Sequence, residues 1–350
     1  MIEPVPARVE PFFSPRPWGA RSLAPFFPEK TDLKELLGEA WLTSMDSPVA
    51  NGPFAGKSLG DSWRAMPEEW RGTRLGHYCG FPLLVKFIFP CDMLSIQVHP
   101  DDAYAATHEQ EAGGRGKTEM WHILSAQPGA ELLIGLKAGV TKEVFRESIA
   151  KGNVEALFLR HPVRPEETYF LPAGTQHAIG PGMVLCEVQE YSDLTYRVYD
   201  FGRADPSGKP RELHIEKALE VTNFAGTRGG KIPPLALHSP DAKKQLLAAC
   251  EFFATERWDC HKTTLIESDP ERFQLLVILQ GHGKIYDADR ALDYRTGEAW
   301  FLPASLPVLS LQPASATALL RITVPDLAAL HRQLRRMGFE EAAIARVLIE

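Results

Sequence analysis

The sequence of 350 residues contains no apolar run that approaches the roughly 20 residues of a membrane-spanning helix. Its first residues also lack the basic stretch and following apolar stretch that are typical of a signal peptide. Cysteine is scarce, since the chain has five, an odd number, with no Cys-x-x-Cys motif and no regular spacing. This pattern excludes a disulfide framework, so we expect a protein of the reducing cytoplasm with no membrane partner. The cysteines are Cys79, Cys91, Cys186, Cys250 and Cys260.

Positive charge is not in excess either. The 38 Lys and Arg residues are outnumbered by 45 Asp and Glu residues, and the formal net charge is -7. This balance argues against nucleic acid and anionic membranes as partners, but a small anionic substrate remains possible because the charge of a pocket is local. The chain has 28 Pro and 27 Gly between short apolar segments. That composition predicts a mostly β protein.

Strand-sized apolar or alternating segments begin at Phe81, after an irregular stretch rich in Pro, Gly and Trp. We expect short helices over residues 31–37, 141–149, 154–159 and 211–223. Residues 233–240 are interpreted as a linker to a second series of strands. Two last helices, separated at Met337 and Gly338, are predicted near the C-terminus. Their apolar spacing indicates packing on the body of the protein or, alternatively, binding to a partner.

The tetrapeptide Phe-Leu-Pro-Ala occurs twice, at residues 170–173 and 301–304, each time after a strand pair and a glycine turn. This repetition predicts two similar β-barrels in tandem. We expect an N-terminal catalytic barrel with an irregular leading segment (1–230), a second barrel (231–324) and C-terminal helices (325–350).

Only the first copy continues into a histidine motif. Residues 172–177, Pro-Ala-Gly-Thr-Gln-His, fit the pattern P-x-G-x-x-H. Pro172 and Gly174 make a tight turn between two strands, and His177 then begins the next strand facing inward. The motif resembles the second signature of the cupin superfamily, whose members are double-stranded β-helix (jelly-roll) barrels. The resemblance implies a mostly β fold of two cupin-type barrels with a few short helices.

Further metal-ligand candidates precede this motif. Gln97 and His99 are two residues apart, as are Lys117 and Glu119, so each pair lies on one face of a strand. Two His, one Glu and one Gln offer mixed N/O ligation that suits Zn²⁺ with an open position, although Mn²⁺ or Fe²⁺ also fits. An isolated strand His is more often a hydrogen-bonded structural residue than a ligand, and Gln is a rare ligand. The joint pattern outweighs these simpler interpretations.

The other histidines are not part of this joint pattern of ligand candidates in the sequence. His122 lies on the opposite face from Glu119 by simple alternation, so we interpret it as structural. Isolated histidines that we assign to the surface or to supporting positions are His108, His161, His214 and His238.

Longer sequence blocks make the resemblance specific. The segments LSIQVHPDD, GKTEMWHIL, FLPAGTQHAIG, EVQEYSDLTYRVYDFGR and RELHIEKAL resemble successive blocks of the type I mannose-6-phosphate isomerases, short bacterial branch. Similar early blocks are WG, GEAWLTS and VANGPFAGKSL, where the family pattern has Glu-Ile in place of Leu42 and Thr43. The resemblance runs from about residue 10 to residue 225.

The resemblance implies a zinc-dependent enzyme that interconverts mannose 6-phosphate and fructose 6-phosphate through a cis-enediol. The zinc ligands implied are Gln97, His99, Glu119 and His177, the set that strand alternation also proposes. The implied catalytic residues are Arg197, Lys117 and Glu187. Glu187, Lys117 or a zinc-bound water remains open as the base, and a lysine beside a divalent cation is expected to have a lowered pKa.

Two other classes of function remain as alternatives. One is a non-catalytic sugar-phosphate sensor, and the other is a different metal-dependent cupin enzyme such as an oxygenase. Aligning Phe170 with Phe301 places Val308 opposite His177, and His282 is isolated. We therefore expect one Zn²⁺ per chain, in the first barrel, and a second barrel filled by side chains.

Overall fold

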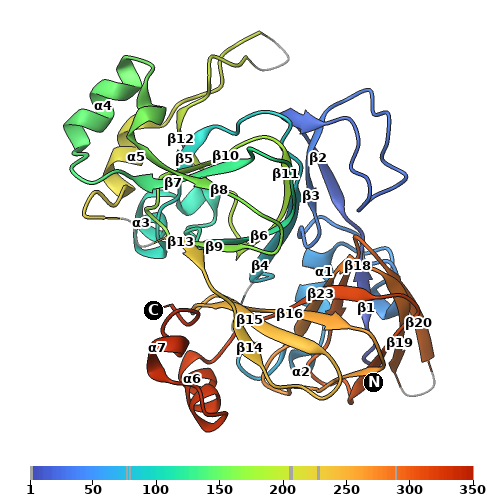
Figure 1. Cartoon of the computed structure of the whole chain (residues 1–350). Coiled ribbons are helices and arrows are strands. Elements are labelled where there is room, and N and C mark those ends of the chain that lie inside the picture. Colours follow the sequence, from blue (N-terminus) through green and yellow to red (C-terminus); the bar gives the residue numbers. More distant parts are fainter. Residues whose placement is uncertain are drawn as a thin grey trace.

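The computed structural model describes residues 3–75, 78, 80–204, 208–226, 229–287 and 290–349. The chain is mostly β, as the sequence predicts, and its strands form four sheets. Figure 1 shows two stacked parts, one of residues coloured cyan to yellow and one of residues coloured orange to brown. Within the described residues, no helix is long and apolar enough to cross a membrane.

The first unit is a pair of facing sheets. Its seven-stranded sheet contains, in spatial order, β13 (Gly230–Ile232), β9 (Thr168–Leu171), β6 (Glu119–Ala126), β11 (Met183–Glu190), β4 (Leu83–Ile88), β3 (Leu37–Trp41) and β2 (Phe12–Ala20). Its five-stranded sheet contains β12 (Tyr196–Tyr199), β5 (Ile96–Val98), β10 (His177–Ile179), β7 (Glu131–Leu136) and β8 (Phe158–Pro162).

The second unit repeats this plan with fewer strands. Its seven-stranded sheet contains β1 (Ala7–Val9), β21 (Ala299–Leu302), β18 (Gln274–Gln280), β23 (Thr317–Thr323), β16 (Ala254–Cys260), β15 (Lys243–Ala249) and β14 (Leu235–Leu237). Its four-stranded sheet contains β17 (Thr264–Ile266), β22 (Leu309–Pro313), β19 (His282–Asp287) and β20 (Arg290–Arg295).

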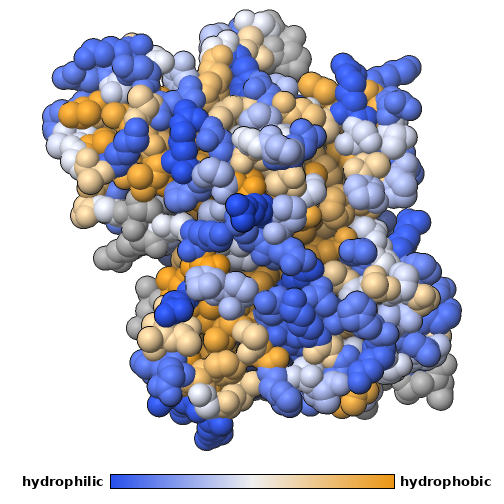
Figure 2. Space-filling model, viewed as in Figure 1, coloured by the Kyte–Doolittle hydropathy of each residue, from blue (hydrophilic) through white to orange (hydrophobic). Residues whose placement is uncertain are grey.

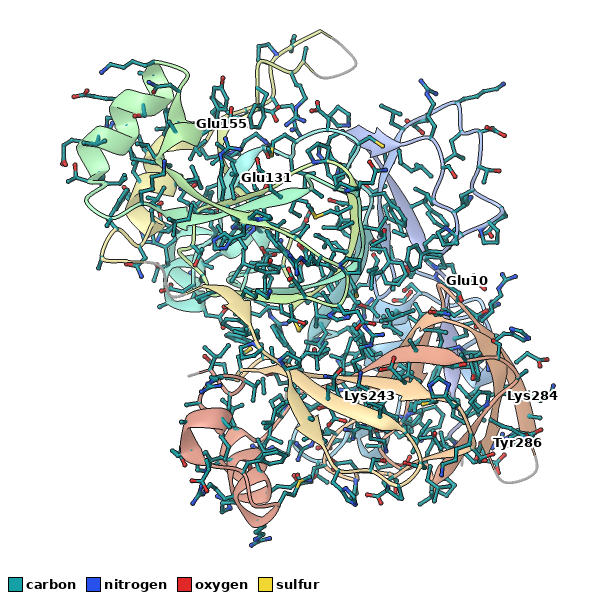
Figure 3. The ribbon with its side chains drawn as sticks, viewed as in Figure 1. Glu10, Glu131, Glu155, Lys243, Lys284 and Tyr286 are labelled. Atoms are coloured by element: carbon teal, nitrogen blue, oxygen red, sulfur yellow. The ribbon has the colours of Figure 1, made fainter. Side chains whose placement is uncertain are left out.

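In the two large sheets, strand alternation distributes apolar side chains between the interior of each unit and the space between the units. Trp121 and Ile123 of β6 point into the first unit, and Leu276 and Ile278 of β18 point into the second. The residues between them on these strands, such as Met120, belong to the apolar core that joins the two large sheets back to back. Figure 2 shows hydrophobic residues on the surface at the level of this junction, and Figure 3 shows side chains filling both units.

The N-terminal segment contributes to both units. Strand β1 pairs with β21 of the second unit, although β2 and β3 belong to the first. Trp63 of helix α1 (Leu59–Ala65) packs edge to face on Phe81 and on Phe273, at ring distances of 5.3 and 5.5 Å. The irregular leading segment therefore ties the two units together.

Four further short helices follow α1 along the chain; the first of them lies against the second unit, where Trp70 O accepts a hydrogen bond from Ala304 N, and the other three lie against the first unit. They are α2 (Glu68–Arg71), α3 (Asp102–His108), α4 (Lys142–Ala150) and α5 (Ile215–Val221). Three 3-10 turns accompany them, η1 (Gly52–Phe54), η2 (Gln110–Ala112) and η3 (Val154–Leu157). The helices expected at residues 141–149 and 211–223 are thus confirmed, with Thr141 as the N-cap of α4. The turn η3 is shorter than the helix expected over 154–159, because β8 begins at Phe158.

Two expectations about local structure are wrong. Residues 31–37 form no helix, because Leu33 N donates to Arg21 O and the Arg21 guanidinium donates back to the carbonyls of Leu33 and Lys34. These tertiary contacts outweigh the helical pattern of the segment. The expected linker at residues 233–240 also contains a strand, β14, which pairs with β15.

Helices α6 (Leu327–Arg336) and α7 (Glu341–Ile344) end the chain, separated near Met337 and Gly338 as the sequence predicts. Gly338 has φ +89°, a conformation that glycine adopts without strain. Leu334 and Ile344 pack with Leu246 and Ala249 of β15. Both helices therefore lie on the second unit, in red in Figure 1.

Candidate metal centre and active site

Three buried side chains converge between the two sheets of the first unit. His99, Glu119 and His177 each offer one ligand atom, and these atoms all lie within 4.8 Å of one another. His177 begins β10 and His99 follows β5, its neighbour in the five-stranded sheet, whereas Glu119 begins β6 of the facing sheet. The structure thus brings together three of the four ligands that the sequence proposes.

Gly174 sets the turn that delivers His177. It has φ +82°, and a Cβ there would lie 2.9 Å from the carbonyl oxygen of Val221. Only glycine meets both conditions without strain or displacement. The glycine of P-x-G-x-x-H is therefore required by the backbone and by the close approach of the segment after α5.

The hydrogen bonds of the two histidines fix where their lone pairs point. Nδ1 of His99 donates to Leu194 O at 2.7 Å, and Nδ1 of His177 donates to Thr175 O at 2.8 Å. Desolvation, and then the charge of Lys117, lowers both pKa values, that of His177 to about 4. Both imidazoles are therefore neutral near pH 7, and their Nε2 atoms are acceptors: that of His99 lies 3.3 Å from Lys117 Nζ, and that of His177 lies 3.3 Å from Gln97 Nε2.

Both Nε2 atoms also face a carboxylate. Glu119 Oε1 lies 3.3 Å from His177 Nε2 and 3.8 Å from His99 Nε2, and among the described residues it has no hydrogen-bond donor. Three electron-pair donors that face one another in a buried space repel unless a cation lies between them. The donor set therefore fits a divalent metal, with each histidine oriented by a carbonyl at its other nitrogen.

Gln97 lies at the edge of this group. Its Nε2 is 3.3 Å from His177 Nε2, and Ser95 Oγ lies 3.4 Å from its Oε1. Rotating the amide by half a turn exchanges these two atoms, since an amide presents O and N in similar positions. The carbonyl oxygen of Gln97 can thus face the same space as the three other donors.

Lys117 and Glu187 extend the group into a charged network. Lys117 Nζ lies 2.7 Å from Glu119 Oε2, 3.3 Å from His99 Nε2 and 3.6 Å from Glu187 Oε1. Desolvation lowers the pKa of Lys117, but the two carboxylates outweigh it, so the pKa lies above its usual value. The lowered pKa that the sequence suggests refers to Lys117 beside a bound divalent cation, whose positive charge would add to the effect of desolvation.

Glu187 is held as a carboxylate. Burial raises its pKa, but Lys117 and Lys86 lower it more, to about 2. Lys86 Nζ lies 3.5 Å from Glu187 Oε1, and Trp121 Nε1 donates to Glu187 Oε2 at 2.9 Å. The carboxylate is therefore ionised and fixed in direction at neutral pH.

Arg197 lies on the wall of the cavity that leads to this network. It pairs with Gln97 across β12 and β5, and its guanidinium donates to Ser95 Oγ at 3.3 Å and to Glu212 O at 3.0 Å. The cavity has a volume of about 320 Å³. Arg197, Lys117 and Glu187 all line it, so the three predicted catalytic residues share one space.

The chain resembles known proteins over most of its length. A family model described as "Mannose-6-phosphate isomerase, cupin domain" matches residues 242–319. The probable mannose-6-phosphate isomerase GmuF of Bacillus subtilis is 36% identical over 310 residues, which cover 85% of this chain and 93% of the relative. The chain belongs to the type I mannose-6-phosphate isomerase family.

Further comparisons agree with this family and its cupin fold. The mannose-6-phosphate isomerase of Streptococcus mutans is 34% identical over 276 residues, which cover 78% of this chain and 84% of that protein. The crystal structure of the mannose 6-phosphate isomerase from Bacillus subtilis has a TM-score of 0.82 at 32% identity and covers 91% of this chain and 99% of that chain. The members of this family are enzymes. The family model matches residues of the second unit, whereas the candidate metal ligands lie in the first unit.

The cavity is also lined by ionisable residues that the sequence analysis did not propose for the site. They are Arg16, Glu39, Lys86, Asp193, Arg211 and His214. His214, which the sequence analysis assigned to the surface or to a supporting position, lines the cavity, and its Nδ1 lies 3.3 Å from Arg197 N. Glu39 and Lys86 lie on the neighbouring strands β3 and β4 of the large sheet, and both face inward. Strand alternation in the sequence could have predicted this orientation. Arg211 comes from an irregular segment, and Arg16 lies in β2 where its pairing with β3 is irregular, so neither carries such a signal.

His122 points away from the cavity, as alternation predicts. It is buried, with Nδ1 at 3.0 Å from Thr168 Oγ1 and Nε2 at 3.4 Å from Arg257 Nη1 of the second unit. Burial, and then the charge of Arg257, lowers the pKa of His122 to about 3. It is a neutral structural residue at the contact between the units.

Proposed function

We propose that this protein interconverts mannose 6-phosphate and fructose 6-phosphate, with one Zn²⁺ bound in the first unit. The observation that supports this most is the meeting of His99, Glu119 and His177 beside Lys117 and Glu187 at the end of one cavity. The proposed reaction is that of the family to which the chain belongs. The ionisable groups of the cavity suit it, because the reaction needs one group that accepts a proton and one that donates a proton.

We assign the metal to His99, Glu119, His177 and the carbonyl oxygen of Gln97. A bound divalent cation supplies Lewis-acid polarisation of the sugar oxygens at C1 and C2. Metal binding needs neutral imidazoles and an ionised carboxylate. The hydrogen bonds that Nδ1 of both histidines donates already hold the tautomer in which Nε2 can face the metal.

The chain's own groups can move the proton between C2 and C1. A base takes the proton from C2 of the open-chain aldose, the C–H electron pair forms C1=C2, and the C1=O π pair moves to O1, which takes a proton to give a cis-enediol. O2 then loses its proton and its electron pair forms C2=O, while the C1=C2 π pair takes a proton at C1. Glu187 is ionised and can accept the proton, whereas Lys117 is protonated and can donate one to an oxygen that gains charge. Lys86 and Trp121 keep the Glu187 carboxylate in place.

Arg197 is assigned to the substrate. Its contacts to Ser95 and Glu212 leave donors of the guanidinium uncommitted toward the cavity. A guanidinium binds phosphate or an enediolate in two-point geometry. Arg16 and Arg211 line the same cavity and add positive charge for an anionic substrate.

We further propose that the two units are tandem cupin barrels, the first spanning residues 1–230 with β1 contributed to the second, the second spanning 231–324, and 325–350 forming a helical cap. The four cysteines that the structure describes are free thiols, which agrees with a reducing compartment. The oligomeric state is left open by this proposal.

A coupled assay tests the function. Purified protein supplied with mannose 6-phosphate should form fructose 6-phosphate, detected by a downstream oxidation that consumes only the isomerised product. Turnover should fall after dialysis against a chelator and return with Zn²⁺. Binding of the sugar phosphate without turnover in the metal-loaded protein would instead support a non-catalytic binding protein.

A further inference from the structure

The second unit contains a polar layer at the positions that form the active site in the first. The register of the strands shows this directly. Glu119 pairs with Leu171 on β9, and Gln274 pairs with Leu302 on β21, in the two copies of the Phe-Leu-Pro-Ala segment. Gln274 is therefore the counterpart of Glu119.

The neighbouring strands extend this correspondence. Glu187 pairs with Lys86 across β11 and β4, and Arg321 pairs with Glu256 across β23 and β16. One strand further, Glu39 pairs with Ile88, and Lys244 pairs with Trp258. Three charged positions of the first unit thus have counterparts of opposite charge in the second, whereas Glu119 has the neutral counterpart Gln274. The counterparts of Glu39, Lys86 and Glu187 are Lys244, Glu256 and Arg321.

These counterparts line a cavity of their own, with a volume of about 590 Å³. Arg321 donates to Glu256 Oε1 at 3.0 Å and to Gln274 Oε1 at 2.6 Å, and Trp258 Nε1 donates to Glu256 Oε2 at 2.7 Å. Lys244 Nζ lies 3.8 Å from the centre of the Trp258 ring. Every group is held by another, so the layer is preorganised without a ligand.

A purely structural role does not account for this layer. Partly buried ion pairs contribute little net stability, and an apolar layer of similar size would pack at least as well. The side chains of Glu256 and Arg321 keep 18% and 19% of their exposure, and they face open space rather than a packed core. Polar groups fixed at the wall of a cavity are the arrangement of a small-molecule site.

The charges of the cavity point to a neutral ligand. Each cation that lines it is already beside a carboxylate: Arg321 beside Glu256 at 3.0 Å, Arg272 beside Asp269 at 3.0 Å, and Lys244 beside Asp241 at 3.6 Å. A phosphate would meet these carboxylates and gain no unpaired cation among the described residues. A hydroxyl, in contrast, donates to a carboxylate and accepts from its cationic partner at once.

Part of the cavity wall is apolar. Leu330 and Leu334 of α6 line the cavity and pack with Leu246 of β15, which adjoins the polar layer because it pairs with Glu256 on the sheet. Figure 2 shows hydrophobic residues on this part of the surface, between α6 and β14. A sugar ring has an apolar C–H face and a hydroxyl edge, which matches the apolar and polar parts of the wall.

We propose that this cavity is a second binding site, for a neutral polyhydroxylated molecule of the free hexose class, and that α6 forms its apolar wall. The site binds its ligand at the pseudo-equivalent of the active site, with donors and acceptors in place of a metal. It takes the unphosphorylated sugar, whereas the first unit takes the phosphosugar.

Saturation-transfer NMR on the metal-loaded full chain tests this, with D-mannose, D-fructose and D-glucose as probes. Excess mannose 6-phosphate is present to fill the active site. At least one hexose should show transfer that the phosphosugar does not remove. Absence of transfer from all three would overturn the proposal.

Variants locate the site. Lys244→Met and Glu256→Gln should each weaken hexose binding by about tenfold or more, since each removes a charge-assisted hydrogen bond. Lys243→Met is the matched control, because Lys243 is the adjacent residue of β15, is exposed and lies outside the cavity (Figure 3). Equal weakening in the control, or unchanged binding in both site variants, would contradict the assignment.

The thermal midpoint of each variant shows whether it is folded, and isomerase turnover is measured on the same samples. Retained turnover without hexose binding contradicts the second site alone. Hexose binding without turnover contradicts the proposed function alone.

Discussion

At the scale of single residues, Glu119 lies between the candidate metal ligands and Lys117, to which we assign a part in proton transfer. One of its oxygens faces both histidines, and the other lies 2.7 Å from Lys117 Nζ. Desolvation raises the pKa of Glu119 more than Lys117 lowers it, so this carboxylate is costly to keep ionised without a metal. Its position explains why a carboxylate is buried between two sheets.

Glu119→Gln removes that charge with little change of shape. Zinc affinity should fall by more than about 100-fold, because even residues outside the ligand set alter metal affinity by about 10–100-fold. Emission spectroscopy on dialysed protein measures the retained zinc. Glu131→Gln is the control, since Glu131 pairs with Arg160 on the outer side of the first unit (Figure 3). Retention of zinc by the Glu119 variant would refute the ligand assignment.

Arg197 is expected to act on the substrate and not on the metal. Arg197→Ala should keep one zinc per chain and lower kcat by about 100–1000-fold, the usual effect of removing a group that stabilises developing charge. Steady-state kinetics and metal analysis on the same preparation check both parts. If the variant loses its zinc, Arg197 has a structural role.

At the scale of elements, the turn between β9 and β10 decides where the metal site forms. Gly174 combines a positive φ with a contact to Val221 O, and the second copy of the repeat has Ser305 at this point. In the second unit the interior beyond this turn is filled by Leu276, Leu302 and Leu319 among others. The tetrapeptide Phe-Leu-Pro-Ala thus ends a strand in both units. Only the first copy continues to Gly174 and His177, which contribute to the candidate metal site.

Gly174→Ala should therefore destabilise the fold and weaken zinc binding together. Gly139→Ala is a matched control: Gly139 has φ +81° and open space around it, so it carries the conformational strain of about 1 kcal/mol without the contact. Chemical unfolding of both variants measures the difference. Equal losses of stability would show that the approach to Val221 is unimportant.

His122 makes the contact between the units sensitive to acid. Its folded pKa of about 3 lies below the usual value of 6.5, so between these values the unfolded chain binds the extra proton. The stability that neutral His122 contributes is complete above pH 6.5 and is lost as pH falls, at up to about 1.4 kcal/mol per unit. His122→Asn should flatten the fall of unfolding free energy between pH 6.5 and about 4. Parallel curves for the variant and the parent protein would contradict this.

At the scale of the whole molecule, four sheets stack in series, and the two large sheets share one apolar core. The active-site cavity opens in the first unit, and the proposed hexose cavity opens in the second. The N-terminal segment crosses between the units through β1 and Trp63. The units are therefore expected to unfold together, because neither keeps a complete core alone.

Local patterns in the sequence predict the mostly β fold and the meeting of the proposed ligands His99, Glu119 and His177 at one place. Alternation places Gln97 with His99 and Lys117 with Glu119, because the side-chain period of a strand is fixed. It does not reveal Arg16, Arg211 or His214, which reach the cavity from segments distant in sequence. The sequence wrongly predicts a helix at residues 31–37 and does not reveal the pairing of β1 with β21. Both features depend on tertiary contacts, which a local pattern does not contain.

The central claim is that a single zinc in the first unit supports isomerisation. Titrating metal-free protein with Zn²⁺ while measuring fructose 6-phosphate formation tests it most directly. Turnover should rise in proportion to added zinc and level off at one ion per chain. Turnover before any zinc is added, or a plateau at two ions per chain, would contradict the account.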